Sequence, residues 1–274
     1  MSSKLSTFIC QNCGTETSQY FGKCLNCNSW NSIVEEIKST KSKYKDIKSS
    51  KKSIPFNEIS SKKISRFTSG FEEFDRVLGG GIVPGSVVLL GGEPGIGKST
   101  IVLQSAGKVS LKEKVLYVTA EESLEQVKIR WERLNQNSVD LKIFAETNLS
   151  LIIEEIKRIN PSLAIIDSIQ AIQNDEMESS PGSVSQVRAC SSELQNLAKD
   201  NNIALLIIGH VTKDGALAGP KTLEHLVDVV INFEGDNISS NRLLRSIKNR
   251  FGSTFEIGIF EMLEEGLREI KNPS

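Results

Sequence analysis

The residues from Gly92 to Thr100 carry the clearest chemistry in this sequence. They fit the pattern G-x-x-x-x-G-K-[ST] and follow a short apolar run, Ser86 to Leu90. Glycines at these places let backbone N–H groups face phosphate oxygens at the N-terminus of a helix. Lys98 would reach the β and γ phosphates, and Ser99 would offer its hydroxyl to Mg²⁺. A glycine-rich turn that happens to carry a lysine would not require this full spacing. The predicted nucleotide site consists of Gly92, Glu93, Pro94, Gly95, Ile96, Gly97, Lys98, Ser99 and Thr100.

Polar residues follow the apolar runs that should become neighbouring strands. Asp167 ends one run and is predicted to hold Mg²⁺ directly or through water, the alternative being a surface acid at a strand end. Glu121 ends another run and is predicted to orient or deprotonate the attacking water, with Glu122 as its rival. Ser168 and His210 stand at strand ends where they could meet the γ-phosphate.

Four cysteines near the N-terminus have the spacing of a metal site. They form two C-x₂-C pairs separated by ten residues, so that four thiolates can converge on one Zn²⁺. A redox dithiol or a disulfide is the alternative, and a reducing cytosol disfavours both. The predicted zinc ligands are Cys10, Cys13, Cys24 and Cys27. Trp30 is expected to pack within this ribbon, and Cys190 to be partly buried and inert.

Composition divides the chain of 274 residues into three parts. The cysteine module occupies residues 1–36, and residues 37–65 form a Lys/Ser-rich linker that is expected to be flexible. That linker is either a solvated tether or a tether that also holds phosphates by charge. The net charge of −1 gives no global basic signal for nucleic acid. The sequence has no apolar run long enough to cross a membrane and no leader-like N-terminus, so we expect a cytoplasmic location without membrane contact.

Residues 66–274 alternate between strand-like and helix-like patterns. Most of the strand segments are apolar without alternation, which is typical of a parallel sheet covered by helices on both faces. Helices are expected near 98–111, 124–134, 149–159 and 183–199, and the segments 227–233, 242–248 and 255–260 are expected to form a β extension. The predicted fold class is therefore α/β, with a phosphate-loop core preceded by a small zinc ribbon.

Three motifs together resemble the bacterial RadA (Sms) family, which is related to the RecA recombinase. They are the two cysteine pairs, the segment from Gly92 to Thr100, and Lys248-Asn249-Arg250-Phe251-Gly252. The resemblance covers essentially the whole chain. It implies a RecA-like ATPase core that binds ATP and Mg²⁺ and forms hexameric rings on DNA. Family members continue into a Lon-like domain, and this sequence ends at Ser274, about where that domain would begin.

The resemblance also implies partners and roles for single residues. Lys248 or Arg250 would reach the nucleotide of an adjacent subunit, as an arginine finger does, although a basic surface hairpin is the alternative. The segments 168–181 and 211–222 correspond to the two DNA-facing loops, with Lys213 and Lys221 as candidate phosphate contacts. The implied activity is ATP-driven branch migration by a helicase-like motor. The implied partners are single-stranded or branched DNA and a RecA-type recombinase. A nucleotide-switched adaptor without translocation is the alternative, and a KaiC-like signalling ATPase would not explain the zinc ribbon.

Overall fold

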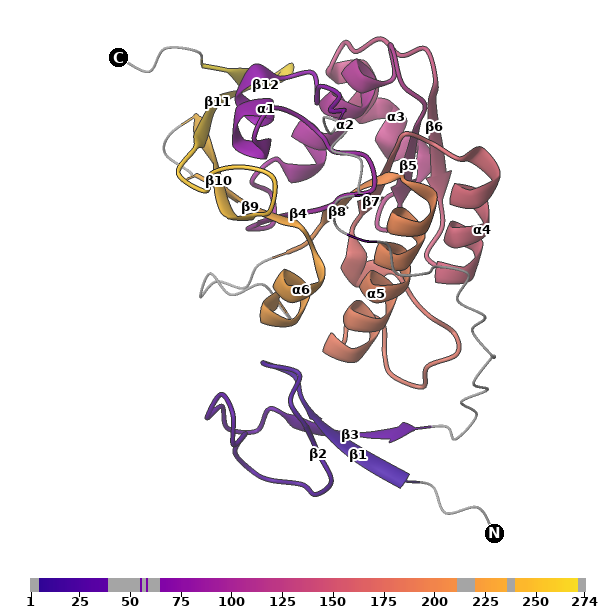
Figure 1. Ribbon diagram of the computed structural model, residues 1–274, viewed down its shortest axis with the longest axis vertical. Coiled ribbons are helices and arrows are strands. Elements are labelled where there is room, and N and C mark those ends of the chain that lie inside the picture. The colour runs from indigo at the N-terminus through magenta and orange to yellow at the C-terminus, as the bar shows by residue number, and fades with distance from the viewer. Residues whose placement is uncertain are drawn as a thin grey trace.

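The computed structural model describes residues 5–38, 55, 58, 65–210, 220–235 and 240–270. These residues form a small ribbon and a larger α/β core, which lie beside each other as separate units (Figure 1). Within these ranges, no helix has the length and apolarity needed to cross a membrane. The predicted linker, residues 37–65, lies largely outside the described residues.

The ribbon is a three-stranded antiparallel sheet with the order β2-β1-β3. Its strands are β1 (Leu5–Cys10), β2 (Glu16–Thr17) and β3 (Ile33–Lys38). Its buried apolar cluster consists of only Cys10, Cys24 and Ile33, with Phe8 and Cys13 packed against them. So small a core supplies little hydrophobic stabilisation, which leaves the ribbon dependent on the group that its cysteines bind.

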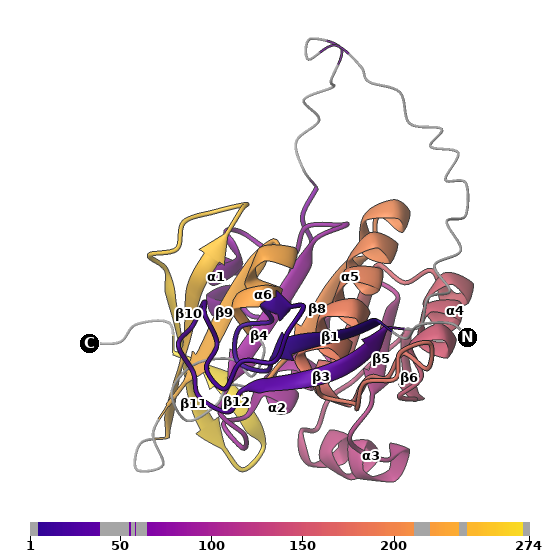
Figure 2. The same ribbon diagram turned by 90° about the horizontal axis from the view of Figure 1, so that it is seen from below.

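The core is built on a nine-stranded sheet with the order β12-β11-β10-β9-β4-β8-β7-β5-β6. Strands β9 to β6 in this order run parallel, and β10, β11 and β12 extend the sheet in antiparallel fashion, at one end of the sheet in Figure 2. The parallel strands are β4 (Val87–Gly92), β5 (Val115–Thr119), β6 (Leu141–Ala145), β7 (Leu163–Asp167), β8 (Ala204–Ile208) and β9 (Val229–Glu234). The antiparallel strands are β10 (Asn241–Asn249), β11 (Ile257–Leu263) and β12 (Gly266–Glu269).

Helices cover both faces of the sheet, as the apolar strands require. One face carries α1 (Glu72–Leu78), α2 (Lys98–Val109) and α3 (Leu124–Arg133). The other carries α4 (Leu149–Ile159), α5 (Val184–Asn201) and α6 (Pro220–Leu226). A short 3₁₀ helix, η2 (Ile169–Ala171), follows β7. The predicted α/β class with a mostly parallel sheet is confirmed.

Side-chain caps explain where several helices begin. Ser123, Asn148 and Ser183 each accept a hydrogen bond from a backbone N–H of the first turn, which satisfies a donor that the helix itself leaves free. Asn160 and Asn202 end α4 and α5 in the left-handed conformation. These caps fix the residues at which α3, α4 and α5 begin and at which α4 and α5 end.

Two expectations about single residues need revision. Trp30 does not pack inside the ribbon: its side chain is 71% exposed, and its described ring contact is with the Lys23 ammonium at 5.7 Å. The reason is that the ribbon has too few residues to enclose an indole. Cys190 is completely buried, and burial raises the pKa of its thiol to about 12, so it is inert as expected but not partly exposed.

Candidate nucleotide and zinc sites

The phosphate loop joins the end of β4 to the start of α2. Gly97 is the N-cap of α2 at φ 112°, a backbone conformation that residues with a side chain rarely adopt, so this position favours glycine. Lys98 is 4% exposed, and its Nζ donates to the carbonyl oxygens of Gly92 and Glu93, each at 2.8 Å. Burial lowers the pKa of Lys98 to about 8, against the opposing attraction of Asp167 and Glu121. The lysine is therefore held inside the loop, at the place where phosphate oxygens would meet the helix N-terminus.

Asp167 ends β7 opposite Thr119, the last residue of β5. It is 7% exposed, and its Oδ2 accepts a hydrogen bond from the Tyr117 hydroxyl. Burial raises the pKa of Asp167, while hydrogen bonds from Tyr117 and Ser99 oppose that rise. Ser99 and Asp167 thus bring a hydroxyl and a carboxylate together beside the phosphate loop. Hard oxygen donors of this kind fit Mg²⁺.

The two candidate bases point to different partners. Glu121 accepts a hydrogen bond from the Ser168 hydroxyl and lies 3.2 Å from His210 Nε2. The bond to His210, helped by Ser168 and Lys98, lowers the pKa of Glu121. Glu122 instead forms an ion pair with Arg130 of α3. Glu121 is therefore grouped with the residues around Lys98, whereas Glu122 is held against a helix.

The basic motif at the end of β10 lies far from this chain's own phosphate loop. Asn249 pairs with Val229 at the start of β9, whereas the phosphate loop follows the end of β4, a strand parallel to β9. Lys248 and Arg250 therefore sit at the edge of the sheet where the parallel strands begin. Neither cation can serve the nucleotide site of its own chain from there.

The remaining contacts of this motif explain its composition. Asn249 Nδ2 donates to the Val77 carbonyl at 3.2 Å, and a Cβ on Gly252 would lie 2.8 Å from Gly79 Cα. Lys248 Nζ donates to the carbonyls of Glu224 and Val227 at 2.5 and 2.8 Å, at the C-terminal end of α6. Arg250 pairs with Asp228 at 2.9 Å and remains half exposed. Asn249 and Gly252 thus fix the turn, and Arg250 is the more accessible of the two cations.

The two candidate DNA-contact lysines cannot be located by side chain. Lys213 lies outside the described residues. Lys221 falls in α6, and its side chain is likewise outside the description. Segment 168–181 is described, and Asn174 ties it to α5 through hydrogen bonds to Gln186 and Glu193 at 3.0 Å.

The four predicted zinc ligands converge. Their Sγ atoms all lie within 4.8 Å of one another, with Cys10 and Cys27 3.6 Å apart and Cys13 and Cys24 3.5 Å apart. Tetrahedral Zn²⁺ with Zn–S bonds of about 2.3 Å places its sulfurs about 3.8 Å apart, which fits this cluster. Burial acts to raise the pKa of Cys13, but bonds from the Thr15 hydroxyl and backbone outweigh it and lower that pKa to about 6.

Sequence reasoning missed several partners of the predicted residues. The contacts of Tyr117 with Asp167, Arg130 with Glu122 and Asp228 with Arg250 join residues that are 50, 8 and 22 positions apart. Each of these partner residues looks ordinary in the sequence: it is an aromatic residue in an apolar strand, or a charged residue on a helix or turn. No signal in the sequence marks these pairings, because strand register and helix packing create them.

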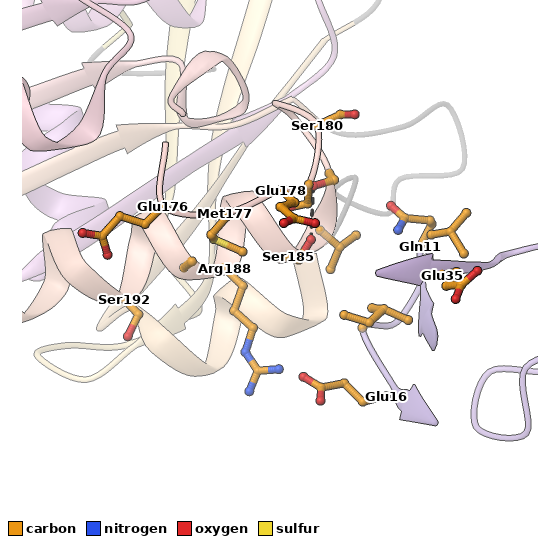
Figure 3. A pocket seen from close by; sticks show the side chains of 17 residues that line it. Gln11, Glu16, Glu35, Glu176, Met177, Glu178, Ser180, Ser185, Arg188 and Ser192 are labelled. Carbon is orange, nitrogen blue, oxygen red and sulfur yellow. Dashed lines mark hydrogen bonds between the residues drawn. The ribbon is translucent and has the colours of Figure 1, made fainter. Parts of the chain in front are cut away.

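A separate hollow of about 1040 Å³ lies between the ribbon and the N-terminal part of α5. Figure 3 shows Glu16 and Glu35 of the ribbon on one side and Glu178 and Arg188 on the other. None of its lining residues belongs to the phosphate loop. Its position therefore does not bear on nucleotide binding.

Comparison with known proteins agrees with this geometry. A model of the AAA domain family matches residues 55–216, and a model described as a rubredoxin metal binding domain matches residues 8–35. The DNA repair protein RadA of Halalkalibacterium halodurans is 50% identical over 280 residues, which cover 100% of this chain and 61% of that protein. The DNA repair protein RadA of Bacillus subtilis is 47% identical over 281 residues, with the same two coverages.

Two solved structures share the fold of the core. A KaiC-like protein from Pyrococcus horikoshii matches with a TM-score of 0.59 and 20% identity, covering 76% of this chain and 99% of that chain. A solved ATPase domain matches with a TM-score of 0.66 and 16% identity, covering 76% of this chain and 92% of its own. At such identities these matches concern the fold alone.

Fold and sites together define a RecA-like phosphate-loop ATPase domain joined to a zinc ribbon. The match to the AAA model and the identity of about 50% with the RadA protein, across the whole chain, define the kind of ATPase domain more closely. The chain belongs to the AAA domain family, and over its whole length it is about half identical to DNA repair proteins RadA. It spans 61% of the length of these curated relatives.

Proposed function

We propose that this chain is the ATPase part of a DNA repair and recombination motor that hydrolyses ATP where two subunits of a ring meet. The observation that carries the ATPase part is the convergence of Lys98, Ser99, Asp167 and Glu121 at the carboxyl ends of β4, β7 and β5, three parallel strands of one sheet. Ligands bind at this edge of such sheets. The DNA part rests on the relatives, which are named DNA repair proteins.

Within one subunit, each residue has a separate task. The phosphate loop and Lys98 hold the triphosphate, and Ser99 and Asp167 hold Mg²⁺, which neutralises phosphate charge when bound. Glu121 orients the attacking water, and its bonds to Ser168 and His210 keep it on the phosphate side of the site. Glu122 is a weaker candidate for that task because Arg130 already holds it.

A neighbouring subunit completes the site. Lys248 and Arg250 stand at the edge opposite their own phosphate loop, so a phosphate contact for them requires a second copy of the chain. Arg250 is the better finger because it is half exposed, while Lys248 is bound to the end of α6. The resulting homo-oligomer is a ring, hexameric by the family resemblance.

The DNA contacts belong to the segments that face the ring interior. Segments 168–181 and 211–222, with Lys213 and Lys221, would contact the phosphates of single-stranded or branched DNA, because a translocating motor must not depend on base identity. A RecA-type recombinase in the bacterial cytoplasm is the proposed protein partner. Hydrolysis would reposition segment 211–222 and so drive branch migration.

The test is the steady-state ATPase rate with and without single-stranded DNA, with the mass followed by light scattering. We expect stimulation by DNA together with assembly, and no turnover in a folded Lys98→Ala variant. Turnover that is unchanged in Lys98→Ala would contradict the assigned site. DNA binding by the chain without any stimulation would favour a nucleotide-switched adaptor over a motor.

A further inference from the structure

Tyr117 is a fully buried side chain whose single polar atom meets the predicted magnesium ligand. It lies in the middle of β5, is 0% exposed and donates its hydroxyl hydrogen bond to Asp167 Oδ2. Its ring packs in the apolar cluster that α2 shares with the sheet. A phenylalanine would fill this space equally well, so packing alone does not explain the hydroxyl.

The register of the sheet creates this contact. Tyr117 pairs with Ile165 and Thr119 pairs with Asp167, so Tyr117 and Asp167 are diagonal neighbours on one face of the sheet. The aromatic ring spans the distance of one pleat toward the carboxyl ends of the strands. The hydroxyl thus approaches Asp167 from within the sheet.

Asp167 also accepts a hydrogen bond from the Ser99 side chain. The two donors, Ser99 and Tyr117, belong to different elements. Ser99 comes from the start of α2, next to the phosphate loop, and is itself a predicted magnesium ligand. Tyr117 comes from β5, whose five residues are all buried. Only the tyrosine can therefore hold the carboxylate while Ser99 turns to a metal ion.

We propose that Tyr117 is a positioning residue that fixes the orientation of the Asp167 carboxylate for Mg²⁺-nucleotide. This inference rests on the magnesium role of Asp167 in the proposed function. Groups that hydrogen-bond a metal-binding side chain orient it, and their loss commonly weakens metal affinity about 10- to 100-fold.

The competing explanation is purely structural. A buried phenol needs an acceptor, and Asp167 could merely satisfy it. The two explanations differ in what they change. A structural role alters stability and nucleotide binding alike, with and without metal, whereas a positioning role alters the Mg²⁺ concentration that nucleotide binding requires.

The experiment titrates Mg²⁺ into the full chain with a fluorescent ATP analogue and records the midpoint of the increase in binding. Tyr117→Phe keeps the ring and removes the hydroxyl, and we expect its Mg²⁺ midpoint to rise about 10-fold. Binding of the analogue in EDTA should stay unchanged. The matched control is Thr119→Val, which removes another buried hydroxyl from the same strand. That hydroxyl donates to the Glu122 carbonyl at 2.8 Å. Its midpoint should remain that of the wild type.

A double-mutant cycle completes the test. In an Asp167→Asn background, Tyr117→Phe should cause no further rise in the midpoint, because the carboxylate that it orients is gone. An unchanged midpoint in Tyr117→Phe, or an equal loss of binding in EDTA, would overturn the inference while leaving the proposed function intact. An unchanged midpoint in Asp167→Asn itself would overturn the magnesium assignment and this inference together.

Discussion

At the residue scale, the site depends on charged groups held in unusual surroundings. Lys98 is buried in its own loop, and burial lowers its pKa to about 8. Hydrogen bonds to His210 and Ser168 lower the pKa of Glu121. Such perturbed groups in one place are typical of catalytic sites. Their protonation therefore provides a direct way to test the site.

The lowered pKa of Lys98 predicts proton uptake when a triphosphate binds. Phosphate charge next to the amine raises its pKa from about 8, so protons are taken up above about pH 8 and uptake fades as the pH falls below that value. Calorimetry near pH 8.5, in two buffers of different ionisation enthalpy, measures this uptake. Lys98→Arg is the control, because a guanidinium stays charged and should take up none. Equal uptake in both proteins would contradict the assignment to Lys98.

Sequence alone predicted the chemically active residues better than the residues that hold them. Spacing predicted that the four N-terminal cysteines form one metal site, and their sulfur atoms do converge, since zinc binding imposes a fixed local pattern. Tyr117 could not be found this way: it looks like any aromatic in an apolar strand, and its role depends on how β5 pairs with β7. The assignments of Lys98, Ser99, Asp167, Glu121, Lys248 and Arg250 remain predictions.

At the element scale, apolar patterns predicted the long elements, and two short elements were missed. Helix α4 has the predicted bounds, because its apolar periodicity and its caps agree. Helix α6, with seven residues, and β12, with four, were not anticipated. Both are short enough that their contacts with the rest of the core decide their structure.

The ribbon should depend on zinc for its fold while the core does not. Its buried cluster is only Cys10, Cys24 and Ile33, so metal binding supplies most of its folding free energy. We expect one zinc per chain, lost in Cys24→Ser, together with rapid proteolysis of the ribbon and an unchanged thermal unfolding of the core. Cys190→Ala is the matched control and should keep its zinc, since Cys190 is buried in the core cluster. Zinc retained in Cys24→Ser would disprove the four-cysteine site.

At the scale of the whole molecule, the two halves of the proposed active site lie at opposite edges of one sheet. This arrangement predicts rescue between inactive variants. Lys98→Ala and Arg250→Ala should each be inactive, and an equal mixture should recover activity, because about one quarter of random interfaces combine an intact phosphate loop with an intact Arg250. The measurement is the ATPase rate after subunit exchange, compared with each variant alone. Failure to recover any activity, in mixtures shown to exchange subunits, would contradict a role for Arg250 between subunits.

The turn that carries Arg250 is joined to α1 at three places. Asn249 donates to the Val77 carbonyl, Arg66 donates to the carbonyls of Gly79 and Phe251, and the backbones of Gly79 and Gly252 touch without side chains between them. The turn and the end of α1 must then move as one stiff piece. In the proposed ring, a neighbouring copy that displaced Arg250 would also displace the end of α1. The chain continues from there through the Gly79 to Gly81 turn to β4, the strand that ends in the phosphate loop. Contact with Arg250 at one edge of the sheet would in this way affect the phosphate loop at the other edge.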